Sequence, residues 1–141
     1  MMDGRGLGKT MINVKTQLMF QGKAKEAIDL YSSIFKEFNV GSIVHYGEGE
    51  EMSAGAFKLA EASFAGHDLL IFNSPPVHDF SFTPSMSIVV DFDTIEELET
   101  AFSKLSEKGQ VMMPLDNYGF SKQYAWVADR FGVSWQLNLP Q

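Results

Sequence analysis

The chain of 141 residues contains no cysteine. This absence excludes disulfide bonds, thiolate-bound metals and cysteine nucleophiles, and it fits a reducing cytoplasm, where we expect the protein to reside. Basic residues are also few, because 11 Lys and Arg stand against 18 Asp and Glu, giving a formal net charge of −7. Nucleic acids and anionic membranes select basic surfaces, so neither is expected as a partner.

Long apolar runs are absent as well, and no stretch approaches the roughly 18 residues that a membrane-spanning helix needs. The apolar content itself is high, with 45% hydrophobic residues and 12 Phe. A chain of this length and content can bury a real core, which excludes general disorder. Residues 1–13 are Gly-rich and unpatterned, so we expect a flexible leader there and a single domain over residues 14–141.

The two halves of this domain show the same order of patterns. Helical spacing of apolar residues covers 24–35 in the first half, and in the second it runs from a cap at Asp93 or Thr94 to Gly109. Three prolines mark 74–84 as the linker between the halves. Strands are predicted at 15–20, 42–46, 56–64 and 67–73 in the first half, and at 86–92, 111–115, 121–129 and 133–139 in the second.

Fixed offsets align the two halves as an internal repeat. An offset of 71 places Leu18 on Val89, and an offset of 66 places 67–73 on 133–139. Two βαβββ modules, about 14–73 and 85–139, would each be too small to bury a sheet alone. We therefore predict an α+β domain whose modules combine into one curved, mixed eight-stranded sheet, with helices on its convex side and a cavity on its concave side.

The last strands carry the most informative local pattern. Residues 124–139, YAWVADRFGVSWQLNL, have the form strand, tight turn, strand, with apolar and polar residues alternating after Gly132. Together with LMFQGKAKEAIDLY at 18–31, this segment resembles the PhnB-like branch of the vicinal oxygen chelate (glyoxalase/bleomycin resistance/dioxygenase) superfamily. Members of that branch are often labelled 3-demethylubiquinone-9 3-methyltransferase domains. The resemblance covers about 14–139 and implies the same two-module fold.

The superfamily's closing strand often has the form D-P-x-G-x-x-x-E, and its Glu binds a metal ion. Asp129, Gly132 and Gln136 fall at those spacings, so the resemblance places Gln136 where the Glu would stand. Metal sites of the superfamily take one ligand each from the first and last strands of both modules. The offsets then assign the remaining positions to Leu70, Thr16, and Ser87 or Ser85.

None of these positions holds His, Asp or Glu. Divalent ions such as Zn²⁺ need imidazole, thiolate or anionic oxygen ligands to offset their dehydration, so we expect no metal and no other cofactor. Shifting the first strand by one residue gives Gln17 in place of Thr16, which is also neutral.

Nine residues are predicted to line a ligand cavity, because they lie on the expected inward strand faces or offer rings toward it. For the aromatic members the alternative is core packing, and for Gln136 it is a hydrogen-bonded place on a half-wet face. No catalytic residue is identified. The nine residues are Thr16, Leu18, Phe20, Leu70, Ser85, Ser87, Trp126, Ser134 and Gln136.

Three functions remain open at this point. The first is a metal-free protein that binds a small, partly apolar molecule, as drug-sequestering members of the superfamily do. The second is a metal-dependent lyase, isomerase or dioxygenase, and the third is a structural or regulatory dimer without a ligand. A homodimer is expected in each case, because small members of the superfamily commonly build a cavity from modules of two chains.

A methyltransferase that uses S-adenosylmethionine is excluded by the predicted fold. Such enzymes ordinarily need a doubly wound sheet with a glycine-rich turn after the first strand. Here the first strand ends in the sequence FQGK at 20–23, which offers one glycine, and each half continues as helix and three strands.

Overall fold

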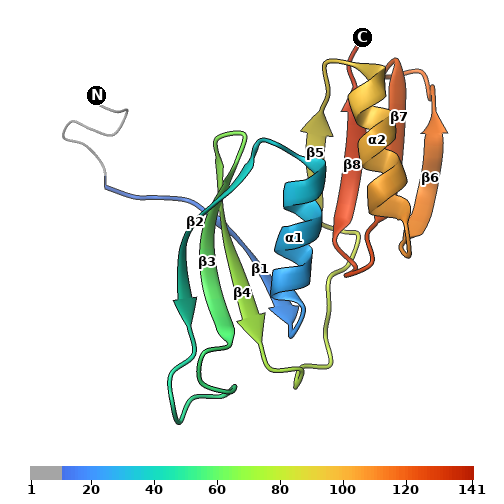
Figure 1. Ribbon diagram of the computed structural model, residues 1–141. Coiled ribbons are helices and arrows are strands. Elements are labelled where there is room, and N and C mark those ends of the chain that lie inside the picture. Colours follow the sequence, from blue (N-terminus) through green and yellow to red (C-terminus); the bar gives the residue numbers. More distant parts are fainter. Residues whose placement is uncertain (1–10) are drawn as a thin grey trace.

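The computed structural model describes residues 11–141, so the predicted leader lies largely outside the described residues (Figure 1). The predicted order of strand, helix and three strands is confirmed twice. The first module consists of β1 (Thr16–Gln21), α1 (Ala24–Ile34), β2 (Phe38–His45), β3 (Phe57–Phe64) and β4 (His67–Ser74). The second consists of β5 (Ser87–Asp91), α2 (Ile95–Ser106), β6 (Gln110–Asp116), β7 (Gln123–Ala128) and β8 (Ser134–Leu139).

Each module forms its own mixed four-stranded sheet. The strand orders are β1-β4-β3-β2 and β5-β8-β7-β6. β1 is parallel to β4 and β5 is parallel to β8, whereas the other neighbours are antiparallel. The predicted α+β fold of two βαβββ modules is therefore confirmed, with the eight strands divided between two sheets instead of running through one.

The helices follow the sequence pattern, with one difference at the end of α2. Thr94 is the cap of α2, and its side chain accepts a hydrogen bond from the backbone N–H of Glu97 at 3.2 Å. The left-handed residue after the helix is Lys108, with φ of 60°, and not the expected Gly109. Gly109 is needed for space, because a Cβ there would lie 2.2 Å from the carbonyl oxygen of Ala128.

The helix-covered faces of the two sheets meet in one shared core, and α1 lies between the modules (Figure 1). The ring of Trp135 on β8 is fully buried, 5.2 Å from the ring of Tyr31 on α1 and 6.1 Å from that of Phe64 on β3. The uncovered faces of the sheets therefore point away from this core and from each other. Over residues 11–141 of one chain, these two faces therefore do not enclose the predicted cavity between them. Neither α1 nor α2, within residues 11–141, has the length and apolar character to cross a membrane.

A buried carboxylate joins the two modules inside this core. Asp129, in the turn between β7 and β8, is 3% exposed. Its Oδ2 accepts hydrogen bonds from the Tyr31 hydroxyl at 2.6 Å and from Trp135 Nε1 at 2.9 Å. Its Oδ1 accepts from the backbone N–H groups of Phe131 at 2.9 Å and Val133 at 3.0 Å. Four donors thus offset the cost of burying the charge, and one of them comes from the other module.

This arrangement predicts how stability depends on alkaline pH. Burial first, and then the negative charge of Asp129, raise the pKa of Tyr31 well above its ordinary value. The folded state therefore keeps the phenol proton at pH values where the unfolded chain loses it. Stability from this source is fully present below the unfolded pKa of about 10 and is lost as the pH rises above it.

We therefore expect the free energy of unfolding to fall above about pH 10, and to fall less steeply in Tyr31→Phe. Urea unfolding of both proteins at a series of alkaline pH values measures the two slopes. Burial also raises the pKa of Tyr46 and of Tyr124, but both tyrosines remain in the variant, so the difference between the slopes isolates Tyr31. Equal slopes would contradict the prediction.

Candidate functional site

The uncovered face of the second sheet carries a connected set of polar side chains, which we call the Gln136 network: Ser87, Tyr124, Trp126, Ser134 and Gln136. The Tyr124 hydroxyl donates to Gln136 Oε1 at 2.8 Å, and Gln136 Nε2 donates to Ser87 Oγ at 3.3 Å. Ser87 Oγ and Ser134 Oγ are 2.6 Å apart, and Trp126 Nε1 donates to Ser134 Oγ at 2.8 Å. Side chains from three adjacent strands are thereby fixed relative to one another.

Strand alternation explains why these side chains share a face. In the sheet, Gln136 lies between Trp126 on β7 and Val89 on β5. Successive side chains of a strand point to opposite faces, so every second residue of β7 and β8 faces away from the core. The intervening residues are buried in the core: Ala125, Val127, Trp135 and Leu137.

The network consists of neutral groups. Burial raises the pKa of the Tyr124 phenol above its ordinary value, so this hydroxyl is a neutral donor at physiological pH. Across residues 11–141 there is no group of three or more His, Cys, Asp or Glu side chains placed to hold a metal ion. The network can therefore donate and accept hydrogen bonds, but it supplies no charge.

Aromatic rings border the network on one side. The ring of Phe120 lies 5.0 Å from that of Tyr124, and the ring of Tyr118 lies 5.9 Å from it. Phe120 is 59% exposed, and Val89 beside Gln136 is 61% exposed. This face thus combines fixed polar atoms with accessible apolar surface.

Four of the predicted cavity residues come together in this network: Ser87, Trp126, Ser134 and Gln136. Tyr124 is a member that the predicted set missed, although its spacing of two residues from Trp126 on one strand could have identified it. Ser85 is exposed in the turn before β5, where its hydroxyl lies 2.8 Å from that of Thr83. It does not reach the network.

Three predicted residues of the first module lie on the opposite, helix-covered face of their sheet. The Thr16 hydroxyl is 3.1 Å from His67 Nε2, Leu18 packs against the core, and Phe20 is 2% exposed beside Tyr31. Leu70 alternates with the buried Leu69 and so lies on the uncovered face. The expected convergence of Thr16 with Leu70 is therefore wrong.

The cause is an error of one residue in the offset between the first strands. Thr16 pairs with Leu69, whereas Trp135, the repeat mate of Leu69, pairs with Ile88. The offset from position 16 to position 88 is 72, and not 71. A shift of one residue moves every side chain of a strand to the other face, so Gln17 is the neighbour of Leu70.

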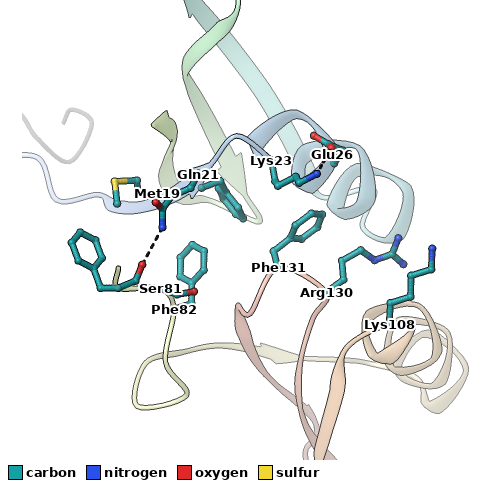
Figure 2. A pocket seen from close by; sticks show the side chains of 11 residues that line it. Met19, Gln21, Lys23, Glu26, Ser81, Phe82, Lys108, Arg130 and Phe131 are labelled. Atoms are coloured by element: carbon teal, nitrogen blue, oxygen red, sulfur yellow. Dashed lines mark hydrogen bonds and ion pairs between the residues drawn. The ribbon is translucent and has the colours of Figure 1, made fainter. Parts of the chain in front are cut away.

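A second feature is a pocket of about 760 Å³ between the modules, which we call the inter-module pocket (Figure 2). The end of β1, the start of α1, the linker, the turn after α2 and the turn between β7 and β8 form its walls. The predicted cavity residue Phe20 lines it. Four phenyl rings and three cations line this pocket: Phe20, Phe80, Phe82 and Phe131, with Lys23, Lys108 and Arg130.

Comparison with known proteins places the chain in a family. A family model described as 3-demethylubiquinone-9 3-methyltransferase matches residues 12–138. The chain belongs to this family. The PhnB protein from Bacillus cereus is 41% identical, with a TM-score of 0.84 over 91% of this chain and 99% of that one. The predicted PhnB-like membership is thereby confirmed.

More distant relatives agree with the fold. The protein YjdN from Escherichia coli (strain K12) is 25% identical over 91 residues, which are 64% of this chain and 61% of YjdN. The match thus spans less than two thirds of YjdN. A glyoxylase/bleomycin resistance protein/dioxygenase domain from Frankia sp. EAN1pec is 13% identical, with a TM-score of 0.62 over 94% of each chain. At this identity the likeness shows the fold alone, and it confirms the predicted fold class.

Proposed function

We propose that this family member binds a small, partly apolar molecule without a metal, and that the uncovered face of the second sheet is the binding surface. The Gln136 network is the observation that carries the proposal. Binding sites for small molecules combine apolar and aromatic walls with a few fixed polar groups, and this face has both. Hydrogen bonds join Gln136 to Tyr124 and to Ser87, so their side chains are fixed in orientation. The lone pairs and protons that these bonds leave unused therefore point in defined directions toward a ligand.

The donor set supports binding without a metal. In the observed register the four positions that correspond to superfamily ligands are Gln17, Leu70, Val89 and Gln136. Two amides and two aliphatic side chains cannot offset the dehydration of a divalent ion. The alternative function, a metal-dependent lyase, isomerase or dioxygenase, would require anionic or imidazole ligands there. Elemental analysis of protein purified without chelator would favour it if it found near-stoichiometric zinc, iron, manganese or nickel.

The family description names a methyltransferase, and the fold argues against that chemistry for this chain. S-adenosylmethionine enzymes ordinarily use a doubly wound parallel sheet with a glycine-rich turn after the first strand. Over residues 11–141 the sheets are two separate mixed ones, with the order β1-β4-β3-β2 in the first. We propose a binding function for the domain at 14–141, and a cytoplasmic location in keeping with the absence of cysteine.

A homodimer forms part of the proposal, because one chain leaves both uncovered faces on its outside. A second copy could cover such a face and turn it into a cavity, and the exposed Val89 and Phe120 supply apolar surface for that contact. Sedimentation at micromolar concentration should give twice the chain mass of 15.7 kDa. A monomer under those conditions would contradict the dimer. A dimer that binds nothing would favour the alternative of a structural or regulatory role.

Thermal-shift screening against a panel of small metabolites tests the binding function. A compound that binds the native state only, at 100 times its Kd, stabilises it by about 2.7 kcal/mol, which is about 5–10 °C for a chain of this size. We expect at least one partly apolar compound to raise the melting temperature of the wild type. In Trp126→Ala the Kd should rise about tenfold or more, because an aromatic contact of the site is lost.

Phe80→Ala is the matched control, because Phe80 is an exposed ring that lies outside the network and lines the inter-module pocket. Compounds bound at the uncovered face should stabilise this variant as much as the wild type. The proposal fails if no compound shifts the wild type, or if every shift survives in Trp126→Ala.

A further inference from the structure

We propose that the inter-module pocket is a second binding site, which takes a small planar apolar molecule carrying an anionic group. The pocket shares no residue with the Gln136 network, so this inference does not depend on the function proposed above. It rests on an aromatic floor, a cationic rim and walls that are held in place.

The floor is a cluster of phenyl rings at the junction of the modules. The ring of Phe20, which is 2% exposed, lies 5.1 Å from that of Phe82 and 5.9 Å from that of Phe131. The contact with Phe131 is edge to face. Phe20 is the buried base of the cluster, whereas Phe82 and Phe131 are half-buried and line the pocket, so their rings can contact a flat apolar ligand.

The cationic rim of the pocket, which consists of Lys23, Lys108 and Arg130, is positively charged although the chain as a whole is acidic. The whole sequence has 11 basic and 18 acidic residues, yet three cations and one carboxylate, Glu26, line this pocket. Figure 2 shows Lys23, Lys108 and Arg130 reaching the pocket from the start of α1, the turn after α2 and the turn between β7 and β8. Cations gathered from three separate segments in an acidic protein indicate an anionic ligand.

The ion pairs at the rim leave this positive charge largely available. Lys23 Nζ lies 3.6 Å from Glu26 Oε2. Because both side chains are more than half exposed, this ion pair is weak. Arg130 pairs at 3.3 Å with Glu107, which does not line the pocket. Lys108 has no ion-pair partner among residues 11–141. A bound anion could therefore recruit Lys108 and Arg130 without breaking a strong interaction.

Hydrogen bonds fix the linker segment that forms one wall of the pocket, so the pocket is preformed in the free protein. The side chain of Gln21 donates from Nε2 to the carbonyl oxygen of Phe80 at 3.0 Å. Its Oε1 accepts from the backbone N–H of His78 at 2.9 Å. One amide thus fixes two linker residues against the end of β1. A preformed pocket loses less ordering entropy on binding than a mobile one.

The test uses two probes that share one skeleton. 1-Anilinonaphthalene-8-sulfonate carries the aromatic rings and an anion, whereas N-phenyl-1-naphthylamine lacks the sulfonate. Fluorescence titration of the folded wild-type protein should give tighter binding of the sulfonate. Its affinity should fall as salt is added, because the contact is ionic and partly exposed.

Two variants then remove single charges from the rim. Lys108→Gly suits the left-handed backbone at this position, so its melting temperature should equal or exceed that of the wild type while the charge is lost. We expect the Kd of the sulfonate to rise about five- to tenfold in Lys108→Gly and in Arg130→Gln. The Kd of the neutral amine should change less than about twofold, because its contacts are with the rings.

Lys36→Gln removes an exposed charge that does not line this pocket and serves as the charge-matched control. Trp126→Ala serves as the control for the uncovered face, and neither control should alter sulfonate binding. The inference is overturned if the sulfonate does not bind the wild type, or if both rim variants bind it as the wild type does. It is also overturned if Trp126→Ala abolishes the binding.

Discussion

Asp129→Ala should lower the free energy of unfolding by about 3–5 kcal/mol, one of the largest losses expected from a single change in this chain. The substitution leaves the Tyr31 hydroxyl, Trp135 Nε1 and two backbone N–H groups without their acceptor in a buried place. Each unpaired buried donor costs about 1–3 kcal/mol, and partial rearrangement prevents the costs from adding in full. Urea unfolding followed by tryptophan fluorescence measures the loss.

Two further variants separate the loss of the hydrogen bonds from the loss of the charge, and from the effect of removing any carboxylate. Asp129→Asn keeps an oxygen acceptor, so its loss should be clearly smaller than that of Asp129→Ala. Asp79→Ala removes an exposed carboxylate from the linker and should change stability by less than about 0.5 kcal/mol. A loss below about 1 kcal/mol in Asp129→Ala would show that the carboxylate does not join the modules.

Trp135→Ala should cost about 3–5 kcal/mol for a different reason. The indole on β8 is fully buried and contacts rings of the first module, with that of Phe35 stacked at 5.6 Å and that of Tyr31 at 5.2 Å. Removing it leaves a cavity that neighbouring rings can fill only in part. Trp135→Phe retains much of the volume but loses the hydrogen bond to Asp129, so about 1–3 kcal/mol is expected. The same unfolding experiments, followed by circular dichroism, measure both.

The two residues should also be coupled. Because Trp135 donates directly to Asp129, the effects of Trp135→Phe and Asp129→Ala share one interaction. The double variant should therefore be more stable than the sum of the single losses predicts, by about 0.5–2 kcal/mol. Additive losses within about 0.3 kcal/mol would mean that the hydrogen bond contributes nothing to folding.

The order of the elements was predictable because it is a local property of the sequence. The stripe of Ala24, Ala27 and Tyr31 follows helical spacing, and all three residues are buried on α1. The alternation after Gly132 likewise separates the buried Trp135 and Leu137 from Gln136 on the uncovered face. Where one face is apolar and the other polar, the pattern alone determines which side chains share the site.

The face of β1 was not predictable in this way. Thr16, Leu18 and Phe20 alternate with Gln17, Met19 and Gln21, so each face holds polar and apolar residues. Its register is set by parallel pairing with β4, which lies about 50 residues later in the chain and leaves no local signal. The offset from the helices is one residue wrong for this strand, so Thr16, Leu18 and Phe20 were assigned to the wrong face, whereas Leu70 on β4 was assigned correctly.

The contact between the modules could not be predicted from the sequence for a similar reason. Tyr31 and Asp129 are 98 residues apart. Tyr31 fits the apolar stripe of a helix and Asp129 fits a turn, so neither residue by its local sequence indicates a contact with the other. Only the packing of the two helix-covered faces brings them together. The same packing creates the inter-module pocket, so its lining from separate segments could not be read from spacing.

The most direct test of metal-free binding is the melting temperature of the wild type with a compound from the panel, before and after dialysis against EDTA. If the Gln136 network binds the compound through neutral groups, the ligand-induced rise should be the same in both samples, and added Zn²⁺ or Mn²⁺ should not increase it. A rise that disappears after EDTA treatment and returns with Zn²⁺ or Mn²⁺ would contradict this and assign the site to a metal.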